Sequence, residues 1–137
     1  LASGLRAHAA ADGRRLAPFT CGFHAVPSMR QLHLHVISLD LASESLKNKR
    51  HFNSFASCFL LPADNVAEQL KREGRVVTRG HVAEESSLKC EMTCPLTHVP
   101  LKNMPAVKQH LGSAAYRIAL DALAAGADMV PRWPATG

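Results

Sequence analysis

Apolar and polar residues alternate along residues 31–38, QLHLHVIS. Alternation with a period of two, in a run that includes β-branched residues, is typical of a β-strand with one buried face. Successive side chains of a strand point to opposite faces, so Leu32 and Leu34 would face the core. His33 and His35 would share the other face, about 7 Å apart along the strand at a rise of roughly 3.3 Å per residue. The pattern therefore predicts two imidazoles on the open face of a sheet.

The same patterns predict the neighbouring elements. Residues 17–27 are expected to be extended, and residues 51–61, HFNSFASCFLL, are expected to form a further strand with Phe52 and Phe55 in the core. A helix is expected over residues 63–73, because a proline precedes this segment and a glycine follows it. Strands and helix thus alternate in this half of the chain.

A change in composition after residue 74 divides the chain. We expect a first domain over residues 1–74, a polar linker over 75–87, a region rich in Cys and His over 88–125, and an Ala/Gly/Pro-rich tail over 126–137. The chain begins with Leu1 in place of Met, and this suggests that the N-terminal part of the first domain is missing.

Composition and charge narrow the possible functions. The 137 residues are 47% hydrophobic, which is enough for a small domain with its own core. The sequence has no apolar run of about 18 residues, so we expect no membrane-spanning segment. We also expect the protein to be a monomer. A net charge of +5 permits a nucleic-acid partner without requiring one. The 4 cysteines are too unevenly spaced for a secreted disulfide framework, and Cys90 and Cys94 beside histidines suggest an intracellular metal site.

The paired histidines are compatible with two chemistries. An imidazole can bind a metal ion, or it can attack phosphorus and later release the adduct. The strand offers no third metal ligand at a chelating spacing. Arg30 comes directly before the strand, and Lys47 and Lys49 lie in the loop after it. Positive charge disfavours a cation and favours a phosphate. Ser28 adds a hydroxyl upstream, and His24 adds another titratable group. Together these residues indicate a phosphate-binding site.

Two sequence blocks, GFHAVPSMRQLHLHVIS and LKNKRHFNSF, resemble a known family. The first is similar to the histidine-triad signature H-φ-H-φ-H-φ-φ, in which φ is apolar. The two blocks together resemble the aprataxin branch of the histidine-triad superfamily. Members of this branch are DNA-adenylate hydrolases with a C-terminal zinc finger. The resemblance implies an α+β fold with a histidine-triad antiparallel sheet, flanking helices and a small C2H2-like finger. It also implies a nuclear enzyme that removes AMP from abortive-ligation 5′ ends through a covalent AMP–histidine intermediate, in DNA single-strand break repair.

The resemblance also implies roles for individual residues. His33 stands at the middle position of the triad, where the family places its nucleophile. His35, at the third position, would bond phosphate oxygens and stabilise the charge of the transition state. Ser28 would lie near the phosphate and the leaving group, and His24 would contact phosphate or assist the departing 5′-phosphate. Lys47 would contact the DNA backbone, and catalysis would need no metal.

The first triad position differs from the family pattern, because it holds Gln31 in place of His. That position orients the nucleophile by hydrogen bonding, and a Gln amide can both donate and accept. We therefore expect Gln31 to bind substrate or to orient His33, with Arg30 and Lys49 as further phosphate contacts.

The Cys/His region resembles a zinc finger. Cys90 and Cys94 precede a segment, MPAVKQH, that reads as the start of a finger helix presenting His110. The family places its fourth ligand four residues beyond this histidine, where the chain has Ala114. We therefore expect His98 to complete a structural zinc site. The alternative is two reduced cysteines in a polar loop.

Two other functions remain open. One is a nucleoside phosphoramidate or dinucleotide hydrolase of the same superfamily, which would need neither finger nor basic loop. The other is a non-catalytic module that binds DNA ends. The expected macromolecular partner is DNA with nicked or 5′-adenylated ends, and RNA–DNA junctions are a further candidate.

Overall fold

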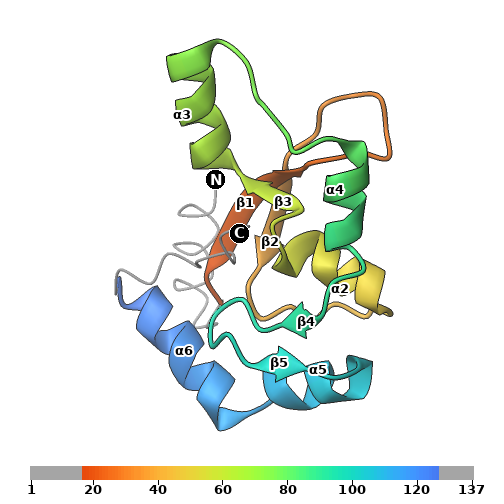
Figure 1. Cartoon of the computed structure of the whole chain (residues 1–137). Helices are drawn as coiled ribbons and strands as arrows, with labels where there is room; N and C mark the ends of the chain where they lie inside the picture. The colour runs from red at the N-terminus through yellow and green to blue at the C-terminus, as the bar shows by residue number, and fades with distance from the viewer. Residues whose placement is uncertain (1–16, 127–137) are drawn as a thin grey trace.

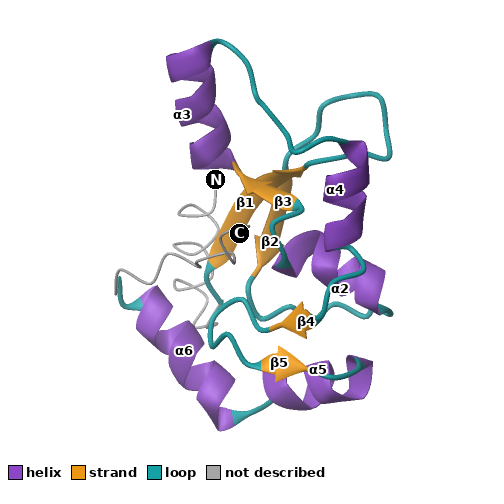
Figure 2. Cartoon of the chain, in the orientation of Figure 1, coloured by secondary structure: helices purple, strands orange, loops and turns teal. Residues whose placement is uncertain are grey.

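The computed structural model describes residues 17–126 (Figure 1). These residues form an α+β fold of two small antiparallel sheets and five helices, which confirms the expected class. In chain order the elements are β1 Phe19–His24, β2 His35–Ser38, α2 Lys49–Ala56, β3 Leu60–Pro62, α3 Ala63–Glu73, α4 His81–Ser87, β4 Met92–Thr93, β5 Pro100–Leu101, α5 Met104–Leu111 and α6 Ala114–Ala124. Figure 2 shows α3 above the larger sheet, α2 and α4 beside it, and the β4–β5 hairpin with α5 and α6 below.

The larger sheet has the strand order β2-β1-β3, with both pairs antiparallel. Gly22 of β1 lies opposite His35 on one side and Pro62 on the other. A Cβ atom on Gly22 would come within 2.6 Å of the carbonyl oxygen of Leu61, so this close approach of the strands requires glycine. The register brings the end of β1, at His24, next to the start of β2.

The strand expected over residues 31–38 is shorter than predicted. Its hydrogen-bonded part begins at His35, and Leu32 and Leu34 are 84% and 46% exposed, so neither lies in the core. The pairing of β1 with β2 ends at the Gly22–His35 pair. Within the described chain, no strand pairs with residues 25–34. The apolar side chains of this segment therefore have no neighbouring strand or layer that could bury them.

The strand expected over residues 51–61 is wrong for its first half, which forms helix α2. The side chain of Asn48 caps this helix by accepting a hydrogen bond from the main-chain N–H of His51 at 3.0 Å. Phe52 and Ala56 are buried at the four-residue spacing of a helical face, and Phe52 is fully buried as expected. The apolar period of this segment is helical, and only its end continues into β3.

Helix α3 confirms the expected helix, and Gly74 ends it in the left-handed conformation at φ 71°. The segment 75–87, which we expected to be a linker, contains helix α4. Glu84 of α4 is 2% exposed, and its carboxylate binds the guanidinium of Arg79 at 2.6 Å. A buried ion pair of this kind depends on the folded chain and leaves no periodic pattern in the sequence.

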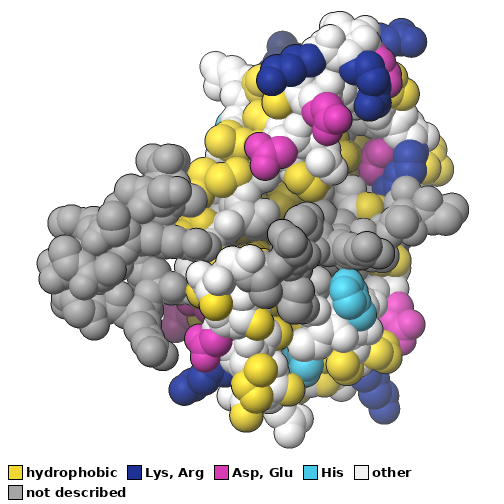
Figure 3. Space-filling model, turned by 90° about the vertical axis from the view of Figure 1, so that its left-hand side faces the viewer, with side chains coloured by type: hydrophobic (Ala, Val, Ile, Leu, Met, Phe, Trp, Pro, Cys, Tyr) yellow, Lys and Arg dark blue, Asp and Glu magenta, His cyan; other side chains and the backbone are white. Residues whose placement is uncertain are grey.

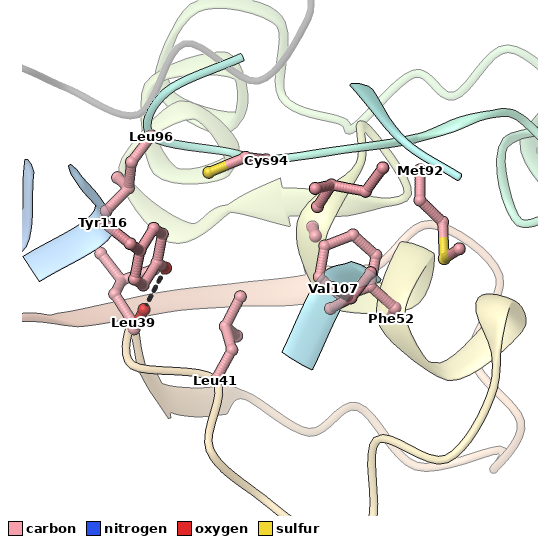
Figure 4. Packing of buried hydrophobic residues seen from close by; sticks show 10 residues of the cluster. Leu39, Leu41, Phe52, Met92, Cys94, Leu96, Val107 and Tyr116 are labelled. Carbon is pink, nitrogen blue, oxygen red and sulfur yellow. Dashed lines mark hydrogen bonds between the residues drawn. The ribbon is translucent and has the colours of Figure 1, made fainter. Parts of the chain in front are cut away.

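Both halves of the chain share one hydrophobic core (Figure 4). Leu39 and Phe52, from the first half, pack in the same cluster as Val107 of α5 and Tyr116 of α6. The Tyr116 hydroxyl donates a hydrogen bond to the carbonyl oxygen of Leu39. The C-terminal segment is therefore attached to the chain that follows β2 by packing and by a buried hydrogen bond.

Candidate active site: a cluster of three histidines

Three imidazoles meet where β1 ends and β2 begins. The rings of His24 and His35 are stacked, with centroids 4.0 Å apart and planes at 27°. His33 lies two residues before His35, the first residue of β2. Its ring meets the His35 ring edge-on, with centroids 4.8 Å apart. The sequence correctly placed His33 and His35 together, although the strand itself begins only at His35. We call these three residues the histidine cluster.

His33 is oriented by the main chain. Its Nδ1 atom lies 3.0 Å from the carbonyl oxygen of Gln31. A carbonyl oxygen only accepts hydrogen bonds, so Nδ1 must carry the proton of this bond. In the neutral ring, Nε2 then holds the free electron pair. The exposed side chain of Gln31 makes no part of this contact.

The stacked pair is held in the neutral form. Burial, followed by the charges that His35 and His33 would carry, lowers the pKa of His24 to about 4, against an opposing main-chain contact from Ser54. Burial and then His33 also lower the pKa of His35. The Nε2 atoms of His24 and His35 are buried and, within the described residues, have no hydrogen-bond partner. Buried polar atoms are normally paired, so these two are available to a ligand.

Aromatic side chains line the stacked pair. Phe55 of α2 lies 5.0 Å from His24 and 5.4 Å from His35 between ring centroids. Phe59, just before β3, lies 5.3 Å from His24. Sequence reasoning assigned Phe55 to the core and missed this role. The Asn48 cap in the sequence could have indicated the helix that brings Phe55 here.

The other expected site residues lie outside the cluster. Ser28 and Arg30 are exposed in the segment between β1 and β2, and Lys47 and Lys49 are exposed at the start of α2. In the described part of the chain, none of their side chains is hydrogen-bonded to an imidazole of the cluster. Their assignment to phosphate or DNA contacts stays a prediction.

Comparison with known proteins bears on this site. A family model described as "Scavenger mRNA decapping enzyme C-term binding" matches residues 7–51, which include the histidine cluster. Transcription factor bHLH140 of Arabidopsis thaliana is 45% identical over 95 residues, 69% of this chain and 10% of that protein. Aprataxin of Gallus gallus is 42% identical over 93 residues, 68% of this chain and 29% of that protein. Aprataxin of Danio rerio is 37% identical over 100 residues, 73% of this chain and 30% of that protein.

The chain is similar in sequence to aprataxins over 68–73% of its own length. It spans 10% of the length of the Arabidopsis relative and about 30% of the two aprataxins. The part of the chain that resembles aprataxins contains His24, His33 and His35 in one short region, and the structure brings all three rings into contact. Within residues 17–126, no helix is long and apolar enough to cross a membrane.

Two of the four expected zinc ligands, Cys90 and His98, have separate surroundings in the structure. The thiol of Cys90 donates a hydrogen bond to the carbonyl oxygen of Ser87 at 2.9 Å, which turns it toward α4. Burial, as the largest effect, raises the pKa of this thiol. His98 is exposed on the loop between β4 and β5, at a φ of 58°.

The other two expected ligands share one neighbour. The sulfur of Cys94 accepts the main-chain N–H of Thr97 at 3.3 Å, and the Thr97 hydroxyl lies 2.9 Å from Nε2 of His110. A hairpin followed by a helix is also the element order of a C2H2 finger. However, the described residues contain no group of three or more Cys, His, Asp or Glu side chains that could hold a metal ion. As they lie, the four donors do not fit one zinc ion, and the finger stays a prediction from sequence.

Proposed function

We propose that this aprataxin-like chain hydrolyses 5′-adenylated DNA ends left by abortive ligation, through an AMP adduct on His33. The supporting observation is the hydrogen bond from His33 Nδ1 to the Gln31 carbonyl, because in the neutral ring it leaves the electron pair on Nε2 free to attack. A nucleophile with a fixed tautomer inside a cluster of unpaired imidazole nitrogens suits phosphorus chemistry better than a structural role.

The reaction has two displacements in this proposal. The electron pair on Nε2 of His33 attacks the phosphorus of the adenylate, and the bond from that phosphorus to the bridging oxygen breaks. The DNA 5′-phosphate leaves with the electron pair of that bond. Water then attacks the phosphorus of the adduct, the P–N bond breaks, and AMP departs while the imidazole is restored. Two easier steps thus replace one difficult step.

His24 and His35 would serve the phosphate in both displacements. Before substrate binds, burial keeps both rings neutral at pH 7. A bound phosphate is an anion, and an anion within about 4–6 Å favours the protonated imidazole. The buried Nε2 atoms would then become N–H donors to the phosphate oxygens, and this stabilises the charge that develops in the transition state.

The DNA would be held through its phosphates by basic side chains outside the cluster. Lys71 and Arg72 stand in the last turn of α3, and Figure 3 shows lysine and arginine side chains gathered at that end of the molecule. Arg30 and Lys47 are proposed as further phosphate contacts, and Ser28 as a hydroxyl near the reacting phosphate and the leaving group. Binding through phosphates releases counterions, so affinity should fall steeply with salt. DNA-end repair of this kind takes place in the nucleus, which is the proposed location.

A second candidate is a hydrolase of small dinucleotides, and it is favoured by the decapping-enzyme description of the family model over residues 7–51. The test compares AMP release from a 5′-adenylated nicked duplex with AMP release from diadenosine polyphosphate and adenosine phosphoramidate. We expect the DNA substrate to have the higher kcat/KM, and we expect added salt to reduce that advantage. Equal or better turnover of the small substrates would replace the DNA-end function with the second candidate. Binding of the duplex without any AMP release would identify a non-catalytic module.

A further inference from the structure

The stacked pair of the histidine cluster has an unusual means of support. His24 and His35 hold their positions without a hydrogen bond to either Nε2 atom within the described residues. Imidazoles at reactive sites are commonly oriented by a bond to one ring nitrogen. His24 has a main-chain contact from Ser54, and beyond this the two rings stack on each other with centroids 4.0 Å apart and both contact the ring of Phe55.

Phe55 is itself held firmly. It lies on α2 between Asn53 and Ala56, which are both buried. The Asn53 side-chain amide, 1% exposed, donates to the carbonyl oxygens of Leu88 at 3.3 Å and Cys90 at 3.0 Å. Asn53 thereby ties α2 to the chain leading into β4. Phe55 therefore presents its ring to the two imidazoles from a helix whose main chain is anchored.

We propose that Phe55 is a positioning residue of the histidine cluster, which fixes the rings of His24 and His35 by contact so that both Nε2 atoms stay free for the phosphate. The proposal rests on the phosphorus chemistry proposed above. A hydrogen-bond partner on Nε2 would hold the rings equally well, but it would occupy the atoms that the substrate needs. An aromatic wall orients the imidazoles and leaves their polar edges open.

The same wall excludes water from the stacked pair. Burial is the largest cause of the lowered pKa of both His24 and His35. The ionisable groups that act on them, within the described chain, are the two rings themselves and His33, and the contacts from α2 come from Phe55 and the main chain of Ser54. Removing the Phe55 ring should therefore admit water and raise both pKa values toward 6.5.

The test uses Phe55→Leu and, as a matched control, Phe19→Leu. Phe19 lies on the same sheet, is also partly buried, and pairs with Ser38 at the far end of β1. We expect NMR titration of Phe55→Leu to show higher midpoints for His24 and His35 than in the wild type. We expect kcat for AMP release to fall roughly ten- to hundred-fold, since misplaced groups cost this much, with KM for DNA nearly unchanged. Phe19→Leu should change none of these quantities.

Two further variants separate positioning from folding. Phe55→Tyr keeps the aromatic wall and should keep both the histidine midpoints and kcat, whereas Phe55→Met fills a similar volume without a ring and should resemble Phe55→Leu. Unchanged midpoints for both histidines in folded Phe55→Leu or Phe55→Met would overturn the proposal. The NMR titration needs no substrate, so a wild-type protein without AMP release would refute the proposed function while the titration still tests the positioning role.

Discussion

The imidazole of His33 donates its Nδ1 proton to the main-chain carbonyl of Gln31, across 3.0 Å. Gln31, at the first triad position, thus orients the proposed nucleophile through its main-chain carbonyl, which every amino acid has. Gln31 departs from the histidine-triad pattern only in its side chain, which is exposed. This departure is therefore compatible with an active nucleophile.

Substitution of Gln31 tests this relationship. In Gln31→Ala the carbonyl remains, so we expect the rate of AMP release to stay within about three-fold of the wild type, a change too small to mark a lost transition-state contact. Gln31→His should behave in the same way. Steady-state kinetics on an adenylated nicked duplex is the measurement. A loss of about a hundred-fold in Gln31→Ala would show that the amide side chain itself serves the reaction.

Stability should depend on pH through His24. The unfolded ring takes up its proton near pH 6.5, whereas the folded ring resists protonation until about pH 4. Between these values the unfolded state binds more protons, so the free energy of unfolding falls as the pH falls from 6.5 to 4. The ring is partly open to solvent, which screens the effect, and we expect a loss of about 1–2 kcal/mol.

Urea unfolding at several pH values measures this loss. In His24→Gln the slope between pH 6.5 and 4 should be smaller, and in His51→Gln, where the histidine is exposed on α2, it should match the wild type. The buried carboxyl of Glu84 also makes stability depend on pH, but only below its ordinary pKa of 4.5. Burial raises the pKa of its carboxyl, but hydrogen bonds from Arg79 outweigh this and hold the pKa below its ordinary 4.5. Equal slopes in the wild type and His24→Gln would contradict the assignment.

Two arginine–glutamate pairs offer a matched comparison of stability. Arg79 binds the buried Glu84 and also donates to Ser87, whereas Arg72 binds Glu73 on the surface. Arg79→Leu leaves a buried carboxylate without its partner, so we expect unfolding to become easier by about 2–4 kcal/mol. Arg72→Leu should cost no more than about 0.5 kcal/mol.

The measurement is chemical denaturation of both variants at neutral pH. The side chains of Arg72 and Glu73 are 63% and 38% exposed, against 35% and 2% for Arg79 and Glu84, so the difference between the variants reports burial. Equal losses of unfolding free energy in Arg79→Leu and Arg72→Leu would mean that the buried pair contributes no more to stability than the surface pair.

Zinc content tests the finger separately. In the described arrangement the Cys90 thiol is hydrogen-bonded to the Ser87 carbonyl, and the described residues hold no group of three potential metal ligands, so we expect purified protein to hold no stoichiometric zinc. Elemental analysis of protein prepared without chelator is the measurement. One zinc per chain that is lost in Cys94→Ser and kept in Cys58→Ser would instead establish the finger predicted from sequence.

Alternating histidines and the upstream His24 are local signals, so the sequence could name the three residues whose rings the structure brings together, while their role in catalysis stays a prediction. It did not predict where the strand ends, because this depends on the Gly22–His35 pairing with β1. Leu32 and Leu34 were consequently assigned to the core and are exposed. A short apolar run can form strand or helix, and the segment that contains Phe52 was assigned to the wrong one of these.

The contacts that complete the site were beyond local pattern. Phe55 meets His24 only because α2 is anchored at Asn53 by carbonyls far along the chain. The orientation of the Cys90 thiol likewise depends on the position of α4. The spacing of Cys and His in the sequence identifies candidate ligands, but tertiary packing determines which of their side chains come close together.

Mapping the AMP adduct tests the proposed chemistry most directly. The protein is mixed with a nicked duplex that carries a radiolabelled 5′-adenylate, denatured at alkaline pH to preserve the P–N bond, and digested. We predict label on the peptide at His33 in the wild type and in His51→Ala, and none in His33→Ala, which should still bind the duplex. An unlabelled wild type, or label that persists in His33→Ala, would contradict the proposal that this imidazole is the nucleophile.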